Sequence, residues 1–238
     1  MKSRIVFALT AILVSAPTWA AEEEEEGPWS GKATLGYLAT SGNTENSTLK
    51  SGFELGYATG KWTHLATAKA INSSENEVTT AEAYELGWKS EWDLSERDFL
   101  FGRLQWRKDR FAGFDTQFSQ TVGYGRHLID TEEHNLSAEV GAGARQSELA
   151  DGTTDNETIL RGGLNYAWQF SDTAKFTQDL TIEAGGNNTY AESISAISAS
   201  LIGELALVAS YTIKHNTDVL APLEKTDTYT ALSLEYAF

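Results

Sequence analysis

The sequence contains no cysteine, few basic residues and no long apolar run beyond its first twenty residues. Without cysteine the chain supplies neither a thiol nucleophile nor a thiolate metal ligand, and this absence suits an oxidising compartment. Its 18 basic residues stand against 34 acidic ones, for a formal net charge of −16. Nucleic-acid binding needs a basic footprint, and a membrane-spanning helix needs about 18 or more apolar residues in a row. The sequence therefore excludes both a nucleic-acid-binding protein and a helical membrane protein.

The N-terminal residues predict export from the cytoplasm. Lys2 and Arg4 give a positively charged start, and Ile5 to Ala16 is apolar but too short to cross a bilayer. The sequence Thr-Trp-Ala that follows ends at Ala20 and has small residues at the two positions that signal peptidase reads. We therefore expect residues 1–20 to be a signal peptide that is cleaved after Ala20. Residues 21–28 (AEEEEEGP) then form an acidic leader, which we expect to be a solvated periplasmic spacer.

Residues 29–238 alternate between apolar and polar side chains with a period of two. This pattern predicts a single all-β domain of about twelve antiparallel strands, each about ten to thirteen residues long. Tight turns alternate with longer connections, such as Ser73 to Thr80 and Ser147 to Asn156, which is typical of an up-and-down transmembrane barrel. The segments Trp62 to Asn72 and Tyr190 to Leu201 alternate weakly, so the pattern does not fix which of their faces points inward.

Alternation alone does not separate a membrane barrel from a soluble β-sandwich, because both bury one face. Two features favour the bacterial outer membrane. The chain ends in an aromatic strand, and Tyr236 and Phe238 resemble the signal that the outer-membrane assembly machinery recognises. Aromatic residues also gather beside the tight turns, as a girdle at a membrane interface requires. That set comprises Trp29, Tyr57, Trp62, Trp92, Phe99, Trp168, Phe170, Phe176 and Phe238.

Four short stretches, in the same order along the chain, resemble the salt-induced outer-membrane proteins of the YdiY type. The resemblance spans roughly Trp29 to Phe238 and implies an outer-membrane barrel without an assigned activity. It carries over no catalytic residue. The stretches are Thr40 to Thr44 (TSGNT), Asp109 to Asp115 (DRFAGFD), Gly123 to Thr131 (GYGRHLIDT), and Lys225 to Thr228 (KTDT) leading to the C-terminal Leu234 to Phe238 (LEYAF).

The predicted inward faces carry charges of both signs, with nine bases and seven acids. Twelve strands lie between the small barrels that side chains fill and the large ones that hold a channel. Two hypotheses follow: a narrow pore for small polar solutes or ions, or a structural, stress-related envelope barrel whose lumen is plugged. The bases are Lys32, Lys50, Lys69, Lys89, Arg103, Arg107, Arg145, Arg161 and Lys214, and the acids are Glu54, Glu85, Glu91, Glu139, Asp179, Glu183 and Glu235.

No connection is long enough to fold inward as a constriction, so side chains on the wall must provide any barrier. Arg103 and Arg107 are four residues apart on one strand, an even number, and therefore line the same face. We expect these arginines to form a gate with Glu85 and Glu139 as partners. Arg145 and Arg161 are further candidates for the lumen lining.

An enzyme and a bound cofactor both have little support in the sequence. A lipid-active enzyme, the third hypothesis, needs a serine beside a histidine on the lipid face near the outer rim. His64 and His215 are predicted to face lipid, but His64 lies next to a periplasmic turn and His215 has no evident serine and acid beside it. The four histidines are scattered without ligand spacing, so we expect neither a metal nor a cofactor. The partners expected are outer-membrane lipid, lipopolysaccharide and the assembly machinery.

Overall fold

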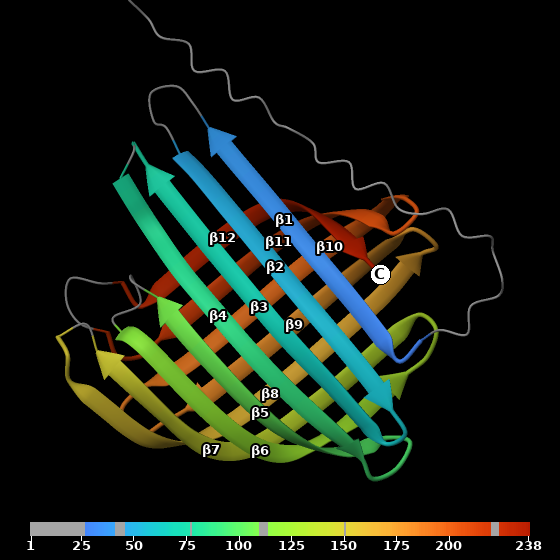
Figure 1. Ribbon diagram of the computed structural model, residues 1–238, viewed down its shortest axis with the longest axis horizontal. Helices are drawn as coiled ribbons and strands as arrows, with labels where there is room; N and C mark the ends of the chain where they lie inside the picture. The colour runs from blue at the N-terminus through green and yellow to red at the C-terminus, as the bar shows by residue number, and fades with distance from the viewer. Residues whose placement is uncertain (1–26, 41–45, 77, 110–113, 150, 220–223) are drawn as a thin grey trace, which may run out of the picture.

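The chain forms a closed antiparallel barrel of twelve strands, in which each strand pairs with its neighbours in sequence and β1 pairs with β12 (Figure 1). The computed structural model describes residues 27–40, 46–76, 78–109, 114–149, 151–219 and 224–238. Within these residues, no helix is long and apolar enough to cross a membrane. The strands are β1 (Trp29–Thr40), β2 (Asn46–Thr59), β3 (Trp62–Glu75), β4 (Val78–Asp93), β5 (Asp98–Asp109), β6 (Phe114–Asp130), β7 (His134–Leu149), β8 (Thr154–Ser171), β9 (Ala174–Ala184), β10 (Thr189–Ile202), β11 (Leu205–Asn216) and β12 (Thr226–Ala237). The signal peptide and most of the acidic leader lie outside the described residues and stay predictions.

The outer face of the barrel is apolar, as the alternating pattern predicts. Large apolar side chains, which are usually buried in soluble proteins, are 61–70% exposed here at Leu35, Val122, Val140 and Leu160. A continuous apolar band of this kind is stable only against lipid. The all-β barrel predicted from the sequence is therefore confirmed.

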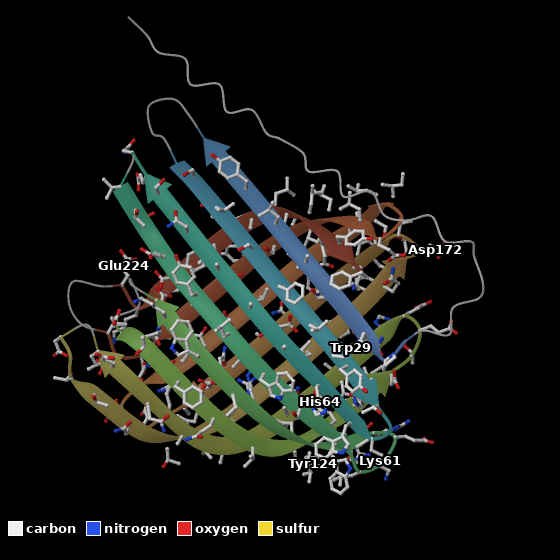
Figure 2. The ribbon with its side chains drawn as sticks, viewed as in Figure 1. Trp29, Lys61, His64, Tyr124, Asp172 and Glu224 are labelled. Carbon is white, nitrogen blue, oxygen red and sulfur yellow. The ribbon has the colours of Figure 1, made fainter. Side chains whose placement is uncertain are left out.

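The two rims differ in their connections. We call the end formed by residues 60–61, 94–97, 131–133, 172–173 and 203–204 the turn rim, and the opposite end the loop rim. Figure 2 shows Lys61 and Asp172 at the turn rim and Glu224 at the loop rim. The strands run further toward the loop rim than expected. β3 continues to Glu75 and β4 begins at Val78, so the predicted connection from Ser73 to Thr80 is largely strand, with Asn76 at a φ of 49°.

Aromatic rings on the outer face gather near the turn rim, where Figure 2 shows Trp29 and His64. The His64 ring stacks on Trp62 and Trp88, with centroids 5.8 and 5.7 Å away. Phe99 is an exception to the predicted girdle. Its ring is 1% exposed and lies on the inner face against His127. Phe99 is four residues from the inward-facing Arg103 and therefore points inward, whereas its neighbour Leu100 points outward.

The C-terminal residue closes the barrel at the turn rim. The backbone N–H of Phe238 donates to the Gly31 carbonyl at 2.9 Å, and the Gly31 N–H donates to the Phe238 carbonyl at 2.7 Å. A side chain at Gly31 would overlap the Phe238 ring, so glycine permits this close approach. The seam between β1 and β12 thus depends on the last residue of the chain.

Candidate functional site

All six lumen residues singled out in the sequence lie on the inner face of the wall. Glu85 is on β4, Arg103 and Arg107 are on β5, Glu139 and Arg145 are on β7, and Arg161 is on β8. Four of these side chains are deeply buried, with exposed fractions of 5% for Arg107, 7% for Glu139, 0% for Arg145 and 4% for Arg161. Charges are this deeply buried only where other polar groups surround them.

Glu183 on β9 is the carboxylate that brings the arginines together. Its Oε1 lies 3.3 Å from Arg161, and its Oε2 lies 3.4 Å from Arg107 and 3.8 Å from Arg145. Arg145 also pairs with Glu157, its cross-strand neighbour on β8. Glu183 has no exposed surface, so the cluster is a buried ion-pair network.

Arg107 reaches across the lumen from β5. Its guanidinium carbon lies 4.2 Å from the ring centroid of Tyr190 on β10, and its Nε lies 4.0 Å from Glu85. A cation over an aromatic face is favourable, and more so away from water. Arg107 and Tyr190 therefore divide the barrel. One part, which we call the filled sector, is bounded by β5 to β9, and the other, the open sector, is bounded by β1 to β4 and β10 to β12.

Glycines allow the filled sector to close toward the turn rim. The rings of Phe99 and Phe101 lie where side chains at Gly125 and Gly123 would stand. Closer to the loop rim, Gln105, Gln117 and Ser147 are buried and joined by hydrogen bonds, directly or through Arg107. Among the described residues, these side chains thus occlude the space beside β5 and β6 and around the Glu183 cluster, whereas a cavity borders β7 and β8 near the turn rim.

One expected pairing is wrong. Glu139 pairs with Lys89 of β4 rather than with Arg103 or Arg107, and Lys89 also lies 2.6 Å from Glu91. Arg103 makes no ion pair within the described residues and donates instead to Gln105 at 3.3 Å. The sequence placed these charges on the correct face, but the closure of the barrel decides which of them meet.

Two cavities adjoin in the lumen. The loop-side cavity, of about 240 Å³, is lined near the loop rim by Asp109 and Asp227. The turn-side cavity, of about 670 Å³, is lined near the turn rim by Glu96 and Asp130. The loop-side cavity is lined mostly by the open sector, whereas the turn-side cavity is also lined by residues of β5 to β9. The two cavities adjoin, because they share lining residues, among them Lys32, Glu54, Lys69, Glu85, Asp179 and Glu192. Together their linings extend from one rim to the other.

The charge balance of the lumen differs from the expected excess of bases. The structure adds one inward base, Lys175, and four inward acids, so that acids slightly outnumber bases. Glu192 was missed because its strand alternates weakly, and the others lie at strand ends, where periodicity is least informative. The added acids are Asp109, Glu157, Glu192 and Asp227.

The histidines on the outer face do not form a hydrolytic site within the described residues. His64 Nδ1 lies 2.9 Å from Ser90 Oγ, but the indole N–H of Trp88 also donates to this hydroxyl, and no carboxylate contacts the histidine. His215 Nδ1 lies 2.8 Å from the Thr226 hydroxyl. No group of histidines and carboxylates in this part of the chain is arranged to hold a metal.

The fold is that of solved outer-membrane barrels, although sequence similarity to them is low. An outer membrane channel from Pseudomonas putida F1 superposes with a TM-score of 0.52 at 10% identity, over 94% of this chain and 99% of that one. The NanC porin superposes with a TM-score of 0.50 at 10% identity, over 87% of this chain and 97% of the porin. The translocator domain of the autotransporter NalP from Neisseria meningitidis superposes with a TM-score of 0.51 at 12% identity, over 87% of each chain.

Sequence comparison identifies the family. The uncharacterized protein YdiY of Escherichia coli (strain K12) is 33% identical over 217 residues, which cover 88% of this chain and 83% of YdiY. Residues 33–238 match the family described as proteins of unknown function, DUF481. The YdiY-type resemblance seen in the sequence is thereby confirmed, and this chain, a twelve-stranded barrel of the outer-membrane type, belongs to the DUF481 family.

Proposed function

We propose that this protein is a narrow passage for small polar solutes or ions across the outer membrane, and that the passage follows the loop-side and turn-side cavities. The observation that carries the proposal is the rim-to-rim lining by the two adjoining cavities. Lys69 supports it, because this inward side chain near the middle of β3 is exposed although the barrel wall surrounds it. An inward ammonium can be exposed only where the lumen beside it has room for water.

Arg107 is the barrier that we propose between the two sectors, and Tyr190, Glu183 and Glu85 hold it in place. Arg103 is a secondary candidate, because it lines the turn-side cavity without an ion pair among the described residues. A second candidate function is the structural envelope barrel that conducts nothing. The buried network around Glu183 favours it, since a barrel filled throughout in this way would have no passage.

The remaining assignments concern location and assembly. We propose cleavage after Ala20, recognition of Tyr236 and Phe238 by the assembly machinery, and a loop rim that faces lipopolysaccharide. An even strand number places both termini on the turn rim, which would then face the periplasm. We propose no catalytic role, because the His64–Ser90 pair has no third member to orient and charge the histidine.

Planar-bilayer recording of the refolded chain tests the passage. We expect a small conductance for the unmodified protein and a larger one for Arg107→Ala, because this change joins the two sectors. Removing a base should also shift the selectivity toward cations. The shift should shrink at high salt, where screening weakens the effect of charges that water reaches. Arg126→Ala is the matched control, because Arg126 lies on the outer face and pairs with Asp98 at the turn rim.

The outcomes separate the candidates. If neither the unmodified protein nor Arg107→Ala conducts at any voltage, the passage is refuted and the structural barrel replaces it. If Arg107→Ala conducts with unchanged amplitude and selectivity, the barrel is open but Arg107 is not its barrier. A response of the Arg126→Ala control equal to that of Arg107→Ala would also refute the role of Arg107.

A further inference from the structure

The loop-side cavity has a charge pattern that suits neither simple cations nor simple anions. Its lining contains seven basic and seven acidic side chains, so that no net charge attracts one sign of ion over the other. Several of these charges make no ion pair within the described residues. The cavity therefore offers separate, unpaired positive and negative groups within one small volume.

Lys50 is the positive group with the clearest geometry. From β2 its Nζ extends past β1 and β12 to donate to the Ser210 hydroxyl of β11 at 3.2 Å. It makes no ion pair in the described part of the chain, and the charges of Lys69 and Lys214 both act on it. An ammonium that faces two like charges and contacts a single hydroxyl retains donors for an anionic group.

Glu192 is the matching negative group. This carboxylate of β10 lines the same cavity and makes neither an ion pair nor a hydrogen bond with the described residues. Its charge acts on both Lys50 and Lys69, so it lies within electrostatic reach of Lys50 without contacting it. Opposite charges that line one cavity and form no ion pair with each other can be bridged by a small molecule.

Two buried hydroxyl groups in the same lining also lack a partner. Tyr190 and Ser233 are each 3% exposed, and neither Tyr190 Oη nor Ser233 Oγ has a hydrogen-bond partner among the residues that the structure describes. Buried polar groups are normally paired, and unpaired ones often mark a binding site. These hydroxyls add two unsatisfied hydrogen-bonding groups to the charged side chains that line the cavity.

We propose that the loop-side cavity binds a small zwitterion, with the anionic end at Lys50 and Ser210 and the cationic end at Glu192. An anion alone leaves Glu192 unpaired, and a cation alone leaves Lys50 unpaired, whereas a zwitterion satisfies both. The volume of about 240 Å³ is below the roughly 300–1,000 Å³ of pockets for drug-sized ligands, so the ligand has few non-hydrogen atoms. The site deepens the proposed function by naming a solute class for the passage.

Ligand-observed NMR on the purified, refolded chain measures binding without requiring conduction. The probes are glycine, 3-aminopropanoate and 4-aminobutanoate, in which the separation of the charges increases, with acetate and methylammonium as single-charge controls. We expect at least one zwitterion to bind about tenfold or more tightly than either control, since a charged hydrogen bond contributes about 1.5–3 kcal/mol.

Three variants test the two ends of the site. Lys50→Gln and Glu192→Gln should each weaken zwitterion binding about tenfold. The swap Lys50→Glu with Glu192→Lys should restore it, because a zwitterion can bind in the reverse orientation. Lys61→Gln, which removes a lysine of the turn rim outside the cavity, should have no effect. A heat-modifiable gel band verifies the fold of every variant, and if the swapped chain does not fold, the single variants decide.

Several results would overturn the proposal. Acetate binding as tightly as the zwitterions would mean a plain anion site. Failure of a folded swap variant to bind would contradict the two-ended geometry. Absence of binding by every probe in a protein that conducts would remove the zwitterion site but leave the passage intact. Zwitterion binding in a protein that does not conduct would support the site and refute the passage.

Discussion

Leu164 and Asn165 on β8 are adjacent in sequence but on opposite faces of the barrel wall, and one substitution at each position tests the assignment of the faces. Leu164 lies near the middle of its strand, opposite Leu180 on β9 and Ala138 on β7, all three on the lipid face. Asn165 faces the lumen, where its Nδ2 donates to Asp179 at 3.0 Å. Arginine at Leu164 must place a guanidinium in hydrocarbon, whereas arginine at Asn165 gains Asp179 as a partner.

The expected difference is large enough to measure. An arginine on the lipid face at the bilayer midplane costs about 2–4 kcal/mol. With about 1.4 kcal/mol per factor of ten, Leu164→Arg should lower the ratio of folded to unfolded protein by about 30- to 1,000-fold. Asn165→Arg should change the free energy of unfolding by less than about 1 kcal/mol, because the new ion pair borders lumen water. Leu104→Arg on β5 is an independent lipid-face variant, since Leu104 is 46% exposed.

The assay is reversible urea unfolding of the refolded barrel in lipid vesicles, followed by tryptophan fluorescence. Similar losses for Leu164→Arg and Asn165→Arg would refute the assignment of the inner and outer faces. Gln105 would be a poor lumen control, although it neighbours Leu104. It is 3% exposed and already accepts hydrogen bonds from Arg103 and Arg107, so a third arginine there would be repelled.

Three further changes probe closure and packing. Phe238→Ser should reduce the outer-membrane yield of the folded, heat-modifiable band, because it removes the ring that covers Gly31. Phe238→Tyr keeps an aromatic ring and should leave this yield unchanged. If the serine and tyrosine variants give equal yields, the aromatic signal is ruled out. Gly143→Ala should lower the free energy of urea unfolding by about 1–3 kcal/mol, because the added methyl group would overlap the backbone of β6. Gly162→Ala is the control, because its methyl group would lie in open space and should leave this free energy almost unchanged. Glu183→Gln should lower the free energy of urea unfolding by about 3–5 kcal/mol, because it removes the negative charge shared by three buried arginines. A loss of less than about 1 kcal/mol would mean that water already reaches the cluster.

Strand positions and faces were largely predictable from the sequence. Tight turns at Gly60 and Gly203 and regular alternation along β7 and β12 set the strand ends and the inward residues there, because a period of two leaves only two faces to choose between. The prediction was weaker where alternation fades. On β10 it did not identify Tyr190 and Glu192 as lumen residues, although both line the loop-side cavity.

The sequence by itself determined the class of molecule: about twelve antiparallel strands, one apolar face, a charged lumen and an aromatic C-terminal strand. Only the tertiary structure decided which charges meet. Arg107 was expected to pair with Glu85, yet its closer carboxylate is Glu183 on β9, four strands away around the barrel. Glu139 pairs with Lys89 three strands away. Local periodicity reports the face on which a side chain stands, whereas the curvature and closure of the barrel bring distant strands opposite one another, so the division into filled and open sectors exists only in the folded chain.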